Sequence, residues 1–149
     1  EMKRALRHIM SYRHETSHQN IYMGINMITV TWDDDAQTII MWHFAPRWTV
    51  DDFVQANNAT RSMIDSQADD VDVIVDLRHS SHMPSNILSL AANALRTGSP
   101  QVRLVVVISH NSLWDKMLSA FNQIHISPYT RIQLVREPED AYRLIQAKR

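Results

Sequence analysis

The chain has no cysteine and only two glycines among its 149 residues. Without cysteine, disulfides, thiolate metal sites and cysteine nucleophiles are excluded, and nothing ties the protein to an oxidising compartment, so a cytoplasmic location is expected. Gly24 and Gly98 are too few for a glycine-rich phosphate loop, a dinucleotide-binding fingerprint or a serine-hydrolase elbow, because each motif needs several residues without a Cβ atom. Most nucleotide-binding and serine-hydrolase functions are therefore excluded.

Long apolar runs and a strong charge of one sign are also missing. The longest apolar run surrounds residues 104–108, far short of the roughly 18 residues that cross a bilayer, so no integral membrane segment is expected. The net charge is −1 and no basic stripe is present, so little counterion release would favour nucleic-acid binding. The length and the 44% hydrophobic content fit one globular domain with a sizeable core.

Residues 1–26 differ from the rest of the chain. They are rich in histidine and polar residues, with only loose helical periodicity between Met2 and Met10. They lack the long apolar segment and small-residue cleavage site of a secretory signal. We expect an appendage, disordered or partly helical, ahead of a domain spanning 27–149; an N-terminal helix packed on that domain is the alternative.

The domain alternates β-branched runs with segments of helical spacing. The expected strands lie near 28–32, 38–44, 71–77, 102–109 and 131–135. The first two flank the acidic turn Asp33 to Asp35 and predict an antiparallel hairpin. Strands 71–77 and 102–108 are apolar on both faces, which predicts two adjacent, parallel, interior strands. The pattern as a whole predicts an α/β domain: a mainly parallel sheet with helices packed on it, opening with an antiparallel hairpin.

Local signals place the ends of the helices. Thr49 and Asp52 form a capping-box pattern for a helix that ends near Ser66. Ser85, behind Pro84, is expected to cap a second helix that Gly98 and Pro100 stop, with Leu88, Ala91, Ala92 and Leu95 on its apolar face. Ser112 with Asp115 is expected to open a third helix, whose apolar face carries Trp114, Met117, Leu118 and Phe121, and Pro138 starts a fourth.

The loop after the strand 71–77 is the strongest candidate for a functional site. Loops that leave the carboxyl ends of parallel strands carry accessible groups on a rigid support. This one holds Arg78, His79, Ser80, Ser81, His82, Ser85 and Asn86.

The element order and this loop resemble the STAS domain of bacterial anti-sigma-factor antagonists (SpoIIAA-like proteins), which share a fold with lipid carriers of the CRAL-TRIO type. In that family an apolar strand ending in a polar-Leu pair leads into a Met-Asp-Ser-Ser-Gly box at the start of a helix. Here Asp76-Leu77 leads into 83–87, MPSNI, so that Met83 and Ser85 fall on matching positions. The likeness covers roughly residues 27–148.

The resemblance implies a non-enzymatic regulatory domain. Such a domain contacts a protein partner and needs no cofactor. The implied docking surface is the loop 78–86 together with the exposed side of the next helix, which offers Ser89, Asn93 and Arg96. A phosphate on Ser85 would add nearly two negative charges beside a helix N-terminus and change that surface.

Two alternatives remain open. Four tryptophans and eight methionines suit a core, with Trp32 and Trp42 as a cross-strand pair, but they also suit the lining of a pocket for a small apolar ligand. His79, His82 and His110, with Asp76, lie at expected strand ends and would together suit the zinc or iron site of a metal-dependent enzyme.

Overall fold

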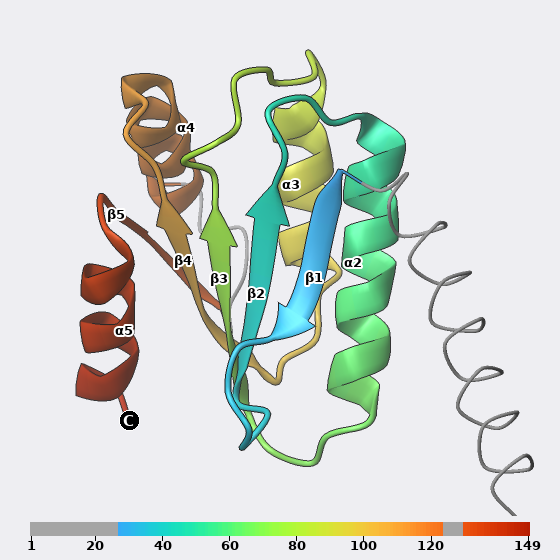
Figure 1. The fold of residues 1–149 in the computed structure, drawn as a ribbon, viewed down its shortest axis with the longest axis vertical. Helices are drawn as coiled ribbons and strands as arrows, with labels where there is room; N and C mark the ends of the chain where they lie inside the picture. Colours follow the sequence, from blue (N-terminus) through green and yellow to red (C-terminus); the bar gives the residue numbers. More distant parts are fainter. Residues whose placement is uncertain (1–26, 124–129) are drawn as a thin grey trace, which may run out of the picture.

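The computed structural model describes residues 27–123 and 130–149, with side chains up to residue 120 and again from residue 130 (Figure 1). The expected appendage 1–26 and the side chain of Phe121 lie outside this part. The described elements are β1 (Ile28–Trp32), β2 (Ile39–Phe44), α2 (Val50–Asp65), β3 (Val71–Asp76), α3 (Ile87–Arg96), β4 (Val102–Ile108), α4 (Ser112–Gln123), β5 (Arg131–Val135) and α5 (Pro138–Ala147). The predicted α/β class and the order of strands and helices are confirmed.

The five strands form one mixed sheet in the order β1-β2-β3-β4-β5. The β1–β2 pair is the predicted antiparallel hairpin, whereas β2, β3, β4 and β5 run parallel. Ile74 of β3 lies between Met41 of β2 and Val106 of β4. The prediction that β3 and β4 are adjacent, parallel and interior is therefore confirmed.

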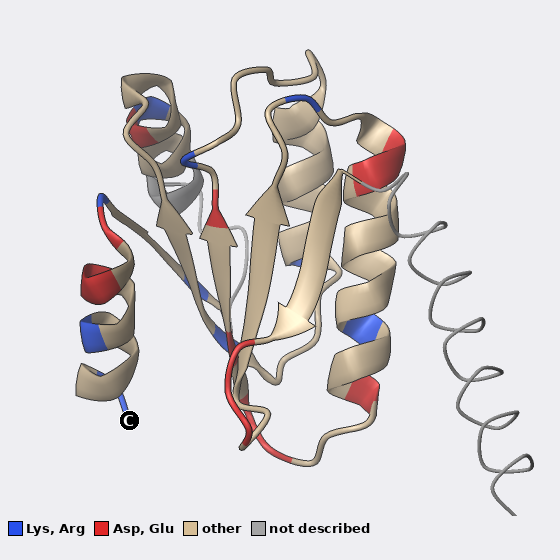
Figure 2. Cartoon of the chain, viewed as in Figure 1, with Lys and Arg blue, Asp and Glu red and all other residues tan. Residues whose placement is uncertain are grey.

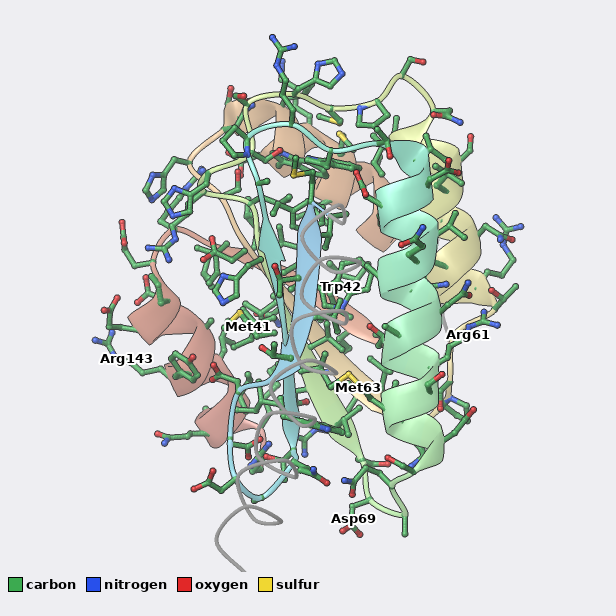
Figure 3. The ribbon with its side chains drawn as sticks, turned by 45° about the vertical axis from the view of Figure 1, so that its right-hand side comes forward. Met41, Trp42, Arg61, Met63, Asp69 and Arg143 are labelled. Carbon is green, nitrogen blue, oxygen red and sulfur yellow. The ribbon has the colours of Figure 1, made fainter. Side chains whose placement is uncertain are left out.

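Helices cover the two faces of the sheet unequally. Side chains of α2, α3 and α4 pack on one face, while α5 packs on the other (Figure 1). Figure 3 shows the alternation in β2, where Trp42 points toward α2 and its neighbour Met41 points to the opposite side. We call the first side the three-helix face and the second the α5 face.

The predicted N-terminal cap is confirmed for α2 and wrong for α3. Thr49 and Asp52 form the predicted capping box of α2: the Thr49 hydroxyl accepts from the Asp52 amide at 3.2 Å, and the Asp52 carboxylate accepts from the Thr49 amide at 2.8 Å. Ser85 is not the cap of α3. The helix begins at Ile87 with Asn86 at the cap position and no side-chain cap bond. The amide of Ile87 bonds the Pro84 carbonyl, so Pro84 to Ile87 form a turn that delays the helix.

Helix α4 begins at Ser112 as predicted, and the side-chain oxygen of the preceding Asn111 accepts from the Leu113 amide at 3.0 Å. One detail differs from expectation. Leu88, expected on the apolar face of α3, is 44% exposed, and Ile87 is the buried residue of that turn instead.

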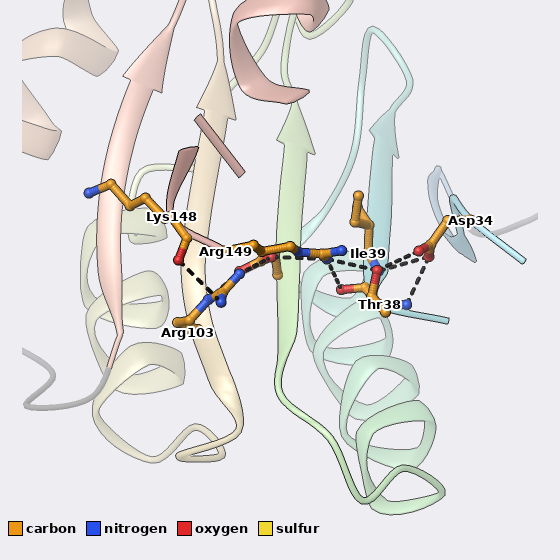
Figure 4. A network of polar contacts seen from close by, with 7 residues as sticks. Asp34, Thr38, Ile39, Arg103, Lys148 and Arg149 are labelled. Atoms are coloured by element: carbon orange, nitrogen blue, oxygen red, sulfur yellow. Dashed lines mark hydrogen bonds and ion pairs between the residues drawn. The ribbon is translucent and has the colours of Figure 1, made fainter. Parts of the chain in front are cut away.

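Acidic residues gather at one end of the sheet, in the β1–β2 turn and the α2–β3 linker (Figure 2). Asp34 has a structural role there, because its Oδ1 accepts from the amides of Thr38 and Ile39 at 2.8 and 2.9 Å (Figure 4). Burial alone would raise the pKa of Asp34, but these bonds and one from the Thr38 hydroxyl hold it below its usual value. The turn is thus built around an ionised carboxylate.

Candidate functional site

The loop 78–86 leaves β3 beside a buried carboxylate. Asp76, the last residue of β3, is 2% exposed. Arg78 grips it in a bidentate pair, from Nε to Oδ1 at 3.0 Å and from Nη2 to Oδ2 at 2.8 Å, while the Arg78 amide also bonds Oδ1 at 3.1 Å. Burial favours a raised pKa for Asp76, yet the Arg78 bonds and the His43 charge outweigh it and lower the pKa. Arg78 therefore serves the strand end and is not a free docking group.

Two serines of the loop are also used internally. The Trp48 indole nitrogen donates to Ser80 Oγ at 2.8 Å. The amide and hydroxyl of Ser81 both donate to the Pro46 carbonyl, at 2.9 and 3.0 Å. These bonds fasten the loop to the connection between β2 and α2. The loop is therefore held against the domain through Ser80 and Ser81.

The remaining docking candidates face solvent. His79, His82, Ser85 and Asn86 are exposed on the loop, and Ser89, Asn93 and Arg96 are exposed on α3. The structure thus keeps the loop and one side of α3 together as one accessible surface.

The histidines expected to share a metal site are not brought together. His110 points to the β5–α5 connection, where its Nε2 lies 2.7 Å from the Arg136 carbonyl and 3.1 Å from Glu137 Oε1. The histidine nearest Asp76 is His43, with Nδ1 3.8 Å from Oδ2, a neighbour that the sequence pattern missed. No group of three or more metal-ligating side chains forms in the described part of the chain.

A cavity of about 150 Å³ lies on the three-helix face, between the sheet and the helices α2, α3 and α4. Helix α3 contributes Ile87, Ala91, Ala94 and Leu95, with Gly98 just beyond its end, so small side chains recur where the helix faces the sheet. The strands contribute Val73, Val75, Val105, Val107 and Ile132, and α4 contributes Trp114 and Leu118. Alanine side chains are short, so they fill less of this space than larger apolar side chains would. Sequence analysis anticipated an apolar pocket but not its position; the signal was the pair Ala91 and Ala94 on the inner side of α3.

Aromatic rings form the wall of the cavity toward α2. Trp42, Phe44, Trp48 and Phe53 lie in contact, with ring centroids 5.0 Å apart for Phe44 and Trp48 and 5.6 Å for Trp42 and Phe53. Trp42 lies opposite Val30 in the hairpin, so it is not directly paired with Trp32 as expected. Its indole nitrogen donates to Thr60 Oγ1 at 2.8 Å, and the Thr60 hydroxyl donates to the Ala56 carbonyl at 2.9 Å. The polar atoms of this wall are satisfied, which leaves its surface apolar.

Comparisons with models of known families, with curated proteins and with solved structures found no match for this chain. Among the residues that the structure describes, no helix is long and apolar enough to cross a membrane.

Proposed function

We propose that this protein is a non-enzymatic regulatory domain that binds a small apolar ligand on its three-helix face, between the sheet and the helices. The observation that supports it is the cavity, which is lined almost entirely by aliphatic and aromatic side chains. Small-molecule sites are typically concave and apolar with few polar groups, and this cavity fits that description.

The size of the cavity limits the ligand. A dry cavity of about 150 Å³ in another protein holds benzene, whereas drug-sized ligands occupy about 300 to 1,000 Å³. The cavity here has the smaller volume, about 150 Å³. The ligand is therefore a molecule with a body of about six to eight carbon atoms, not a full-length fatty acid.

The resemblance to anti-sigma-factor antagonists suggests how ligand binding could affect a protein partner. Helix α3 forms one wall of the cavity, and its outer side carries the exposed Ser89, Asn93 and Arg96. The loop 78–86 bonds Trp48, another wall residue, through Ser80. A ligand that shifts this wall also shifts the exposed surface, so we propose that a protein partner contacts the surface in a ligand-dependent way. Among the described residues, nothing favours the metal-dependent enzyme over this function.

Toluene tests the proposal, because its ring matches the cavity and it carries no charge. We expect calorimetric titration to give a dissociation constant of about 1 mM or lower. Ala91→Leu places a larger side chain in the cavity and should abolish binding while keeping or raising the melting temperature, because it fills existing space. The matched control is Ala59→Leu, the same change at an exposed position of α2, which should bind toluene as the wild type does. Absence of toluene binding to the wild type, or equal binding by Ala91→Leu, would overturn the proposal.

A further inference from the structure

We propose that the ligand is a small apolar carboxylic acid whose carboxylate is held by Arg61 at the rim of the cavity. This inference rests on the proposed function and names the chemical class of the ligand. Arg61 is the only charged residue among the described residues that line the cavity. An exposed cation beside a mostly apolar space suits a molecule with a hydrocarbon body and one anionic end.

Some N–H donors of Arg61 have no hydrogen-bond acceptor among the described residues. It extends from α2 toward the end of α3, where Nη2 bonds the carbonyl oxygen of Thr97 at 3.1 Å and its hydroxyl at 2.9 Å (Figure 3). A guanidinium carries five N–H donors. The Nε and Nη1 donors have no acceptor in the described part of the chain, and no described carboxylate pairs with Arg61. The existing bonds hold the side chain across the gap between α2 and α3.

Asn57 adds a second donor beside it. Asn57 precedes Arg61 by four residues on α2, so the two side chains are neighbours on one face of the helix, and both line the cavity. The side-chain amide of Asn57 has no hydrogen-bond partner among the described residues. By contrast, the Trp42 indole and the Thr60 hydroxyl are already paired within the wall. Asn57 and Arg61 thus offer a ligand two neighbouring donor groups, one turn apart on α2.

The arrangement favours a carboxylate over a more highly charged group. One cation balances one negative charge, and a hydrogen bond from a guanidinium N–H to a carboxylate oxygen is strengthened by the charges of both groups. A phosphate ester would bring nearly two charges to a single arginine. The hydrocarbon part would meanwhile lie against Ala91, Ala94 and the facing valines.

Phenylacetate and toluene form a matched pair of probes, because phenylacetate is toluene with a carboxylate on its methyl carbon. We expect Arg61→Gln to weaken phenylacetate binding about fivefold, the effect of an exposed ion pair near the upper end of the measured range. The same variant should leave toluene binding within about twofold. The matched control is Arg143→Gln, which removes an exposed arginine of α5 that does not line the cavity and should change neither affinity.

A second measurement on the wild type keeps the test independent of the variant's folding. Raising the salt concentration to about 0.5 M should weaken phenylacetate binding but not toluene binding, because salt screens an exposed ion pair. If toluene binds but phenylacetate does not, or if Arg61→Gln leaves the phenylacetate affinity unchanged, the carboxylate inference is wrong while the cavity proposal stands. If neither probe binds the wild type, both are wrong.

Discussion

The two faces of the sheet are built differently. The three-helix face joins long apolar and aromatic side chains to an alanine-rich helix and leaves a cavity of about 150 Å³. The α5 face packs Ile74, Val106 and Ile108 to full burial against Ala141 and Ile145. The three-helix face has free space between side chains, whereas the α5 face is filled by the protein's own side chains. The proposed ligand therefore belongs on the three-helix face, which has the free space, and not on the filled α5 face.

Buried carboxylates occur on the α5 face at both ends of β3. Asp72, 1% exposed, accepts from Arg103 Nη2 at 2.8 Å and from Arg149 Nη2 at 3.3 Å, which ties the segment after α5 to the sheet (Figure 4). Asp76 accepts from Arg78 at the other end. Charged groups hidden in this way are stabilised only by specific partners, so they fix the geometry of their surroundings.

The largest effect is expected from a charge placed in β3. Val73→Asp should destabilise the domain by more than about 4 kcal/mol, because Val73 is buried between β2 and β4 and an unpaired carboxylate is costly there. Ile74→Asp, on the filled α5 face, should cost more still, since residue 73 borders the cavity and has space for a new side chain, whereas residue 74 does not. Chemical denaturation measures both variants. An unchanged unfolding curve for Val73→Asp would contradict the assignment of β3 as an interior strand.

A smaller effect is expected at Asp72. Asp72→Asn leaves two guanidinium groups without their carboxylate and should cost about 2 to 3 kcal/mol. This is less than for a fully buried pair, because Arg103 and Arg149 have partly exposed side chains that can turn to water. Asp70→Asn, at an exposed position of the α2–β3 linker two residues earlier, is the control and should have little effect on the unfolding free energy. Equal stability of the two variants would show that the α5 face does not depend on this pair.

The Asp76 pair should give stability a characteristic pH dependence. Its pKa in the folded protein lies below the ordinary value of 3.8, so the carboxylate contributes stability above that pH and loses it as the pH falls through the folded-state pKa. Asp76→Asn should therefore cost about 1 to 2 kcal/mol at neutral pH and progressively less in acid. Unfolding free energies measured across the acid range test this. A constant difference at every pH would mean that the Asp76 charge is not responsible.

The smallest effect is expected at Ser85. Its hydroxyl does not cap α3, so Ser85→Ala should change the unfolding free energy by less than about 0.5 kcal/mol. Thr49→Ala removes a real cap and should cost about 1 kcal/mol in the same assay. A loss as large for Ser85→Ala as for Thr49→Ala would show that Ser85, and not Asn86, caps α3.

The strands and the capping box of α2 could be predicted because their signals are local. Each strand is a β-branched run, and Thr49 and Asp52 satisfy one another within a single turn. The start of α3 was misplaced because Pro84 and Ser85 also suit the turn that precedes the helix. Local sequence does not separate a cap from a turn residue when both positions favour the same amino acids.

The candidate site could be predicted only in outline. The exposed loop after β3 follows from the parallel sheet, but the pairing of Ser80 with Trp48 depends on a residue 32 positions away. The cavity depends on how far α3 lies from the sheet, which its alanines permit but do not specify. Likewise, Arg61 looks like any exposed helical arginine until the end of α3 is placed beside it.

Mapping where toluene binds tests the central claim most directly. Backbone amide chemical shifts of nitrogen-labelled protein, recorded with and without toluene, report each element separately. We expect toluene to shift the amides of Val73, Val75 and α3, which border the cavity, while those of α5 stay unchanged on the filled face. Shifts confined to α5, or no shifts at saturating toluene, would contradict the assignment of the three-helix face as the binding site.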